Sequence, residues 1–149
     1  MKALHKCVLS IFIVGVTLLI PLTSAMANKY GFWTVNNIGL GASLQQQWGS
    51  GLSMTLKERA YAQPPTGVLN TISVAGEARD RCQVTEPWQI YISLVGIKYS
   101  SNDTGIVSKS GNYQDCGQFE NHEYKDTGQY FYYWPAVGLN TTKYLTDIH

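Results

Sequence analysis

The residues best suited to chemistry lie in one short run, His122-Glu123-Tyr124-Lys125-Asp126. The run is close to the zinc motif H-E-x-x-H, in which a helix places two histidines on one face, but Asp126 stands where the second histidine should be. The glycine and polar residues around the run favour a loop over a helix. We therefore predict a solvated polar loop, and the sequence gives no reason to expect a metal or another cofactor.

A hydrolase in this chain would depend on His122, because the other histidine beyond residue 27 is the last residue, His149. A serine or cysteine nucleophile needs such a histidine and an acid, and a glycosidase needs two carboxylates. Because carboxylates are common, a small secreted hydrolase that uses His122 and nearby carboxylates is only our third hypothesis, and we expect a protein that is not an enzyme. The candidate acids are Glu77, Glu86, Glu120, Glu123 and Asp126.

Five consecutive aromatic residues occupy positions 130–134 and are followed by a proline. In a strand, alternate side chains point to opposite faces, so Tyr130, Tyr132 and Trp134 share one face. Aromatic side chains concentrate in binding sites because they bury a large area at low entropic cost. Our first hypothesis is that the chain binds an extracellular glycan or protein through this aromatic surface, with Tyr130, Tyr132 and Trp134 as the binding residues.

Residues 30–56 form a long stretch without one charged side chain, in which glycines alternate with large apolar residues. Such a stretch suits the membrane-inserting part of a pore-forming or membrane-damaging toxin, which is our second hypothesis and makes a membrane a possible partner. It also suits ordinary strands joined by glycine turns. We favour the strands, because residues 52–57 alternate apolar and polar side chains.

Two cysteines lie beyond residue 27, Cys82 and Cys116, and only one pairing is possible between them. A catalytic or metal-binding pair would have closer spacing, such as C-x-x-C. We therefore predict a structural disulfide. The loop that it closes, of about 35 residues, corresponds to a stabilisation of roughly 3.8 kcal/mol in the chain-entropy model.

Residues 1–27 have the pattern of a signal peptide: lysines at 2 and 6, an apolar run over residues 8–20, and Ala25-Met26-Ala27 at the end. The apolar run, about 13 residues, is shorter than the roughly 20 that a membrane-spanning helix needs. We expect residues 28–149 to form a single β-rich domain, secreted to the extracellular space or the periplasm.

From residue 28 onward the chain carries nine lysines and arginines against ten acidic residues, which gives a formal charge of −1. This balance offers no electrostatic basis for binding nucleic acid. Asn102 and Asn140 begin sequences that fit the N-glycosylation pattern, which matters only in a eukaryote. The oligomeric state is left open by the sequence.

The clearest strand signal covers residues 87–95, rich in β-branched and aromatic side chains. The period-2 pattern assigns one face of this strand to the core, and after Gly96 the phase changes, which predicts a β-bulge at that glycine. A turn at residues 100–105 and a second strand at 106–109 would then complete a hairpin inside the disulfide loop. The side chains assigned to the core are Trp88, Ile90, Ile92 and Leu94.

Shorter strand signals recur along the rest of the chain and are separated by glycine, proline and polar turns. They predict strands at residues 31–35, 51–56, 68–75, 129–134 and 141–145, a charged turn at 76–81, and at most short helices at 43–48 or 56–62. The predicted fold is mostly β: a small antiparallel β-sandwich or partly open barrel stapled by one disulfide.

Overall fold

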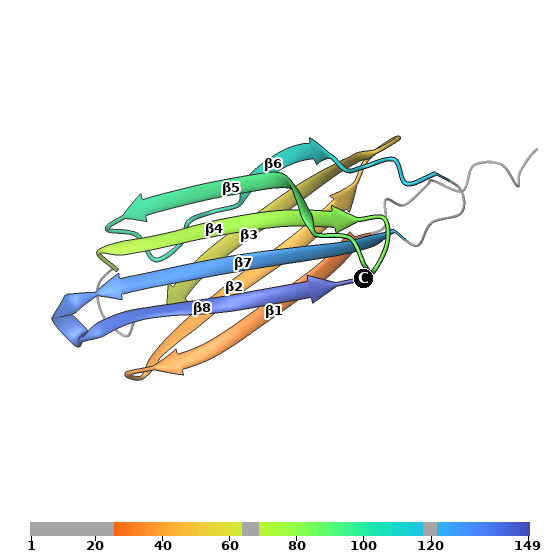
Figure 1. Ribbon diagram of the computed structural model, residues 1–149. Coiled ribbons are helices and arrows are strands. Elements are labelled where there is room, and N and C mark those ends of the chain that lie inside the picture. Colours follow the sequence, from red (N-terminus) through yellow and green to blue (C-terminus); the bar gives the residue numbers. More distant parts are fainter. Residues whose placement is uncertain (1–25, 64–68, 118–121) are drawn as a thin grey trace, which may run out of the picture.

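The computed structural model describes residues 26–63, 69–117 and 122–149, and in these ranges the chain forms eight strands and one short 3₁₀ turn, η1 (Figure 1). The expected signal peptide lies outside the described residues except for its last two positions, which begin the first strand. In chain order the elements are β1 (Met26–Val35), β2 (Ile38–Trp48), β3 (Ser53–Gln63), β4 (Thr71–Arg81), β5 (Gln89–Tyr99), β6 (Val107–Asn112), β7 (Glu123–Trp134), η1 (Pro135–Val137) and β8 (Leu139–Ile148).

The strands form two four-stranded antiparallel sheets that pack face to face. Sheet A has the order β1-β2-β3-β6, and sheet B has the order β5-β4-β7-β8. In Figure 1 sheet B is the front layer and sheet A lies behind it. The predicted fold class, a small antiparallel β-sandwich stapled by one disulfide, is confirmed.

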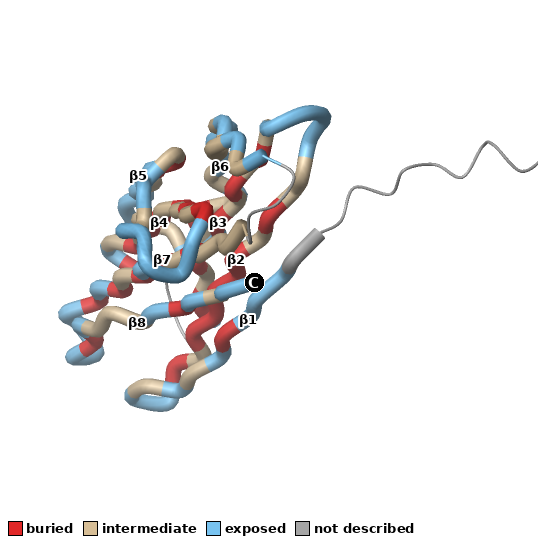
Figure 2. The backbone as a smooth tube through the Cα atoms, turned by 45° about the vertical axis from the view of Figure 1, so that its right-hand side comes forward, coloured by how far each residue is buried: buried red, intermediate tan, exposed pale blue. Residues whose placement is uncertain are grey.

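Side chains alternate between the interior and the outer face along most strands, which Figure 2 shows as buried positions that alternate with intermediate or exposed ones. Strand β4 alternates along its whole length, with every second residue from Ile72 to Asp80 buried. The two inner faces meet in one hydrophobic core, as expected of a sandwich. Its largest fully buried apolar side chains are Ile38, Leu44, Met54, Leu56, Leu69, Ile72, Ile92, Tyr130, Tyr132 and Leu139.

The three aromatic side chains predicted to bind a partner face this core. Tyr130 and Tyr132 are 0% exposed and Trp134 is 7% exposed. The Tyr132 hydroxyl donates a hydrogen bond of 2.6 Å to the Gly41 carbonyl of the opposite sheet. The location of the binding surface is therefore corrected, because these side chains lie between the two sheets. Both faces of β7 are aromatic, so the sequence pattern does not tell which face is covered.

Strand β5 has its bulge earlier than predicted. The pairing with β4 shifts between Ala78 and Arg79, which leaves Tyr91 as the extra residue, whereas Gly96 pairs in register with Val74. The bulge reverses the faces of the residues before it, so Ile90 is exposed although Ile92 is buried. Trp88, also predicted to lie in the core, is only half-buried.

Strand β6 pairs with β3 of sheet A and not with β5, so the predicted hairpin inside the disulfide loop is wrong. The chain crosses from sheet B to sheet A between β5 and β6. The two strands still approach closely at the edge of the sandwich, where the Lys109 ammonium donates a 2.9 Å hydrogen bond to the Ser93 carbonyl. A side chain on Gly96 would lie 2.3 Å from Val107, which explains the glycine there.

Three other local predictions are corrected by the lengths of the strands. Residues 43–48 and 56–62 belong to β2 and β3, so neither is helical. The predicted turn at 76–81 is the second half of β4, and residues 123–126 begin β7 instead of lying in a polar loop. In 56–62, 76–81 and 123–126 the alternating side chains place every second residue inside the sandwich, and Glu58, Asp80 and Asp126 are among the buried ones, so tertiary burial outweighs the polar composition.

Candidate functional site

The outer face of sheet B carries exposed aromatic and β-branched side chains at the end where β5 and β7 finish. The register places Tyr99, Thr71 and Tyr133 in one row across the sheet, and Ile97, Ser73 and Phe131 in the next. Tyr99 is 73% exposed, and the rings of Phe131 and Tyr133 stack with their centroids 6.2 Å apart. We call this surface the aromatic face; it consists of Val95, Ile97, Tyr99, Phe131, Tyr133 and Tyr144.

The middle strand of this face contributes only small side chains, Thr71, Ser73 and Ala75. Because these are flanked by large side chains from β5 and β7, the surface is hollowed along β4. A groove of about 430 Å³ lies where Ala75 and Gly76 form the floor, next to the rows of Tyr99 and Ile97. Tyr144, 65% exposed, stands at its β8 side, and Glu77 lines it toward the disulfide. This volume is within the range of about 300–1,000 Å³ typical of ligand sites.

Charge divides the outer face of sheet B into two halves. Toward the disulfide, Glu77 accepts hydrogen bonds from the Arg79 guanidinium, the shortest 2.5 Å long, and the Lys125 ammonium lies 5.9 Å from the Trp88 ring centroid. The outward side chains of the rows that contain Tyr99, Ile97 and Val95 carry no charge. The aromatic face therefore suits a neutral partner.

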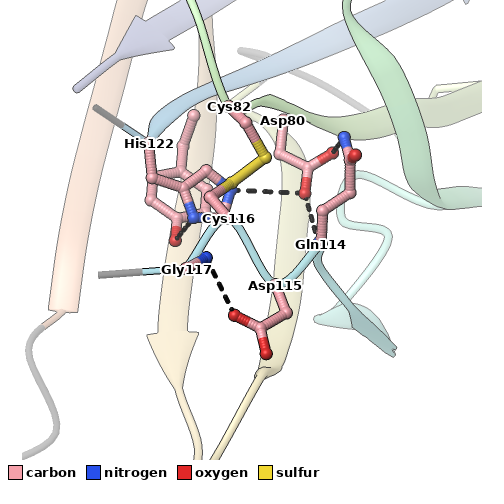
Figure 3. Close-up of a disulfide and its surroundings, with 8 residues drawn as sticks. Asp80, Cys82, Gln114, Asp115, Cys116, Gly117 and His122 are labelled. Atoms are coloured by element: carbon pink, nitrogen blue, oxygen red, sulfur yellow. Dashed lines mark hydrogen bonds and ion pairs between the residues drawn. A yellow bond between two sulfur atoms is a disulfide. The ribbon is translucent and has the colours of Figure 1, made fainter. Parts of the chain in front are cut away.

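His122, the centre of the hydrolase hypothesis, lies beside the Cys82–Cys116 disulfide (Figure 3). Its Nε2 is 3.4 Å from the buried Asp80 carboxylate, and its Nδ1 is 2.8 Å from the Tyr124 hydroxyl. Asp80 also accepts hydrogen bonds from the Gln114 backbone N–H (2.6 Å) and side-chain amide (3.1 Å). The histidine is thus part of the network that fixes the segment around the disulfide.

The groups that His122 would need for catalysis have other roles. Its hydroxyl partner belongs to Tyr124, whose pKa is raised first by burial, so the phenolate is disfavoured. Glu123 pairs with the Arg81 guanidinium at 2.5 Å, and Glu120 lies outside the described residues. In the described ranges no group of three or more histidine, cysteine or acidic side chains is placed to hold a metal ion.

Besides Asp80, two more carboxyl groups are buried, and their burial was not foreseen from the sequence. Glu58 lies between the sheets, over the paired Gly76 and Gly128, and burial raises its pKa to about 8. Asp126 is also fully buried, and burial raises its pKa to about 7. The signal was present in β3, where Glu58 takes an inward position of the alternating series 54, 56, 58, 60. Neither carboxyl group lines the groove of the aromatic face.

The aromatic face itself was only partly predictable. The sequence identified residues 129–134 as a contact strand but assigned its inner face. Tyr99 and Ile97 were missed because the bulge was placed at Gly96. Tyr144 was missed because a single exposed tyrosine carries no pattern.

No known protein-family model matches this chain, and no curated protein matches it in sequence. Within the described residues there is also no helix long and apolar enough to span a bilayer. The Cys82–Cys116 disulfide is consistent with a location outside the cytoplasm.

Proposed function

We propose that this protein is a secreted β-sandwich domain that binds a neutral glycan chain across the aromatic face of sheet B. The observation that carries the proposal is the uncharged end of the outer surface, where the exposed Tyr99 and Tyr133 stand on either side of the small Thr71 of β4. Secretion is supported by the leader-like pattern of residues 1–27 and by the disulfide.

The chemistry of the aromatic face fits a sugar chain. A pyranose ring has an apolar C–H face that packs on an aromatic ring, and hydroxyls that need hydrogen-bonding partners. Between the aromatic rings the same rows present the side chains of Thr71, Ser73, Gln129 and Thr142, which donate and accept without charge. A protein partner would instead meet a surface with polar groups in its centre, where interfaces favour apolar ones.

The test is binding of the purified, disulfide-intact protein to an immobilised panel of neutral glycans. We expect Tyr99→Ala and Tyr133→Ala to weaken binding tenfold or more, which corresponds to about 1.4 kcal/mol each. Tyr30→Ala is the matched control, because Tyr30 is an exposed tyrosine of sheet A. Undiminished binding by both sheet B variants, or no binding across the panel, would overturn the proposal.

A membrane-damaging activity is the second candidate, and one observation favours it. Strands β1 and β2, of 10 and 11 residues, form a hairpin with the length of about 9–11 residues that a membrane-crossing strand has. The stretch from 30 to 56 is uncharged. Release of dye from neutral liposomes by the wild-type protein would support this activity, and intact liposomes at micromolar protein would exclude it.

A further inference from the structure

The outer face of sheet A has an aromatic groove of its own at the same end of the sandwich. Register places Phe32, Gly41 and Tyr61 in one row across β1, β2 and β3. The Tyr61 ring lies over Gly41, where a side chain would approach its Cζ to 2.2 Å, and it meets Phe32 edge-on at 6.3 Å. Phe32 is 71% exposed, although nothing in the core requires a phenylalanine at an outward position.

The neighbouring row is Thr34, Gly39 and Gln63, and here the glycine is uncovered. A Cβ on Gly39 would meet only the Gln63 Cβ, at 4.0 Å. The result is a groove of about 340 Å³, with the Gly39 backbone as its floor, Phe32 and Tyr61 as its walls, and hydrogen-bonding side chains at both ends of the row. The Tyr61 ring therefore covers Gly41, and the space over Gly39 beside it is open.

The described residues that line the groove carry no free charge. The Arg59 guanidinium lies 5.3 Å from the Tyr61 ring centroid, and it donates hydrogen bonds of 3.1 and 3.2 Å from Nε to the Asp103 carboxylate. This pairing lowers the pKa of Asp103, so both groups remain ionised and neutralise each other. The groove therefore suits a neutral ligand better than an ionic one.

We propose that this groove is a second saccharide subsite, which binds one ring of a neutral sugar. The apolar face of the ring would pack against Phe32 and Tyr61, and its hydroxyls would reach the Thr34 hydroxyl and the Gln63 amide. The absence of a side chain on Gly39 makes room for the ring.

Because the two sheets are opposite layers of the sandwich, this groove and the aromatic face of sheet B point in opposite directions. A protein with a sugar site on each face bridges two glycan chains. The groove stands on the geometry of sheet A alone, whereas the bridging also rests on the proposed function of sheet B.

Titration of ¹⁵N-labelled protein with glucose, galactose, mannose, N-acetylglucosamine and their disaccharides tests the groove directly. We expect amide shifts at Phe32, Gly39 and Tyr61 with at least one sugar. Gly39→Val should reduce that affinity tenfold or more, because its side chain fills the groove without displacing a neighbour. Gln45→Val is the matched control, since it places the same side chain on the same face of β2, further along the strand, and it should bind as the wild type does.

Amide shifts confined to sheet B would overturn the sugar site proposed for the groove and leave the function proposed for sheet B standing. Equal sugar affinity of Gly39→Val and the wild type would also overturn the site in the groove. Shifts at sheet A alone would support the groove and overturn the function proposed for sheet B. Bridging is measured as the clustering of beads that are coated with a sugar, chosen because it changes amide shifts on both sheets. It should be lost in Gly39→Val and in Tyr99→Ala separately, and clustering by either variant would overturn it.

Discussion

The two halves of the interior differ in chemistry. Near the β1–β2 and β7–β8 turns the space between the sheets is filled by side chains such as Ile38, Ile72 and Leu139, and we call this the turn end. Toward the disulfide the interior holds Glu58, Asp126 and other polar groups, and we call this the disulfide end. Among the described residues, four buried side chains have polar atoms without a protein hydrogen-bond partner, and they all lie in this half: Gln46, Glu58, Tyr91 and Asp126.

This difference shows where the fold gains its stability. Burial of apolar area stabilises the turn end without further help. Buried polar groups lose hydration, and each unsatisfied group costs about 1–3 kcal/mol. The disulfide end therefore depends on other restraints: the covalent link, the Asp80 network, and the aromatic rings of Trp48, Tyr113 and Tyr124 that pack edge to face near His122. The exposed aromatic surfaces on both sheets lie at the turn end, where the scaffold is apolar inside.

Loss of the disulfide should have the largest effect. The double variant Cys82→Ser/Cys116→Ser is expected to lower the free energy of unfolding by about 2–5 kcal/mol, measured in urea. Hydrogen exchange should accelerate at Trp48 and Tyr124 more than at Ile72. Uniform acceleration in both halves would contradict the division of the interior.

The buried acids should make the protein more stable at acid pH. The pKa values of Glu58 and Asp126, about 8 and about 7, are raised above the ordinary 4.5 and 3.8, so the folded state binds more protons than the unfolded state between these limits. The free energy of unfolding should therefore fall as pH rises from about 4 to 8. Glu58→Gln should be more stable than wild type by at least about 1 kcal/mol at pH 9 and gain nothing at pH 4. Urea midpoints at the two pH values decide this, and a gain that is equal at both would contradict the assignment.

Two tyrosines on one strand allow a matched comparison of the halves. Tyr132→Phe removes the hydrogen bond to Gly41 and should cost about 1 kcal/mol at any pH below 9. Tyr130→Phe removes the hydroxyl that donates to the Glu58 carboxyl group. This hydrogen bond lowers the Glu58 pKa, which means that it stabilises the ionised form. The loss of stability in Tyr130→Phe should therefore be larger at pH 9 than at pH 5. Thermal melts of both variants measure the difference, and parallel pH curves would refute it.

The smallest effect is expected on the surface. Glu77→Gln breaks the pair with Arg79 on the outer face of sheet B, where both side chains are partly exposed. Such pairs contribute about 0.2–1 kcal/mol and are screened by salt. Urea unfolding at low and high NaCl concentration should show a small loss that disappears at the higher salt. A loss of stability well above this range, or one that salt does not change, would contradict the assignment of this pair to the weak, screened ion pairs of the surface.

The sequence was enough to predict the fold class and the disulfide, because strand periodicity and cysteine count are local or unique signals. It was not enough to orient β7, since Tyr130, Phe131, Tyr132 and Tyr133 present aromatic rings to both faces. The partner of β6 was also out of reach, because strand pairing depends on register between segments far apart in the chain. The alternation along β3 puts Glu58 on the inner face, but the space for an acid there depends on two glycines from different strands, Gly76 and Gly128, that only the register of sheet B brings together.

Those two glycines constrain how the sequence can change over time. A methyl group on Gly76 would lie 2.8 Å from one Glu58 carboxyl oxygen, and one on Gly128 would lie 2.7 Å from the other oxygen and 2.2 Å from the Tyr130 hydroxyl. The three positions are therefore epistatic: a larger residue at Gly76 becomes acceptable only after Glu58 has been shortened, and the reverse order passes through a damaged intermediate. Substitutions at positions 58 and 76 are expected to accumulate in one order, with position 58 changing first.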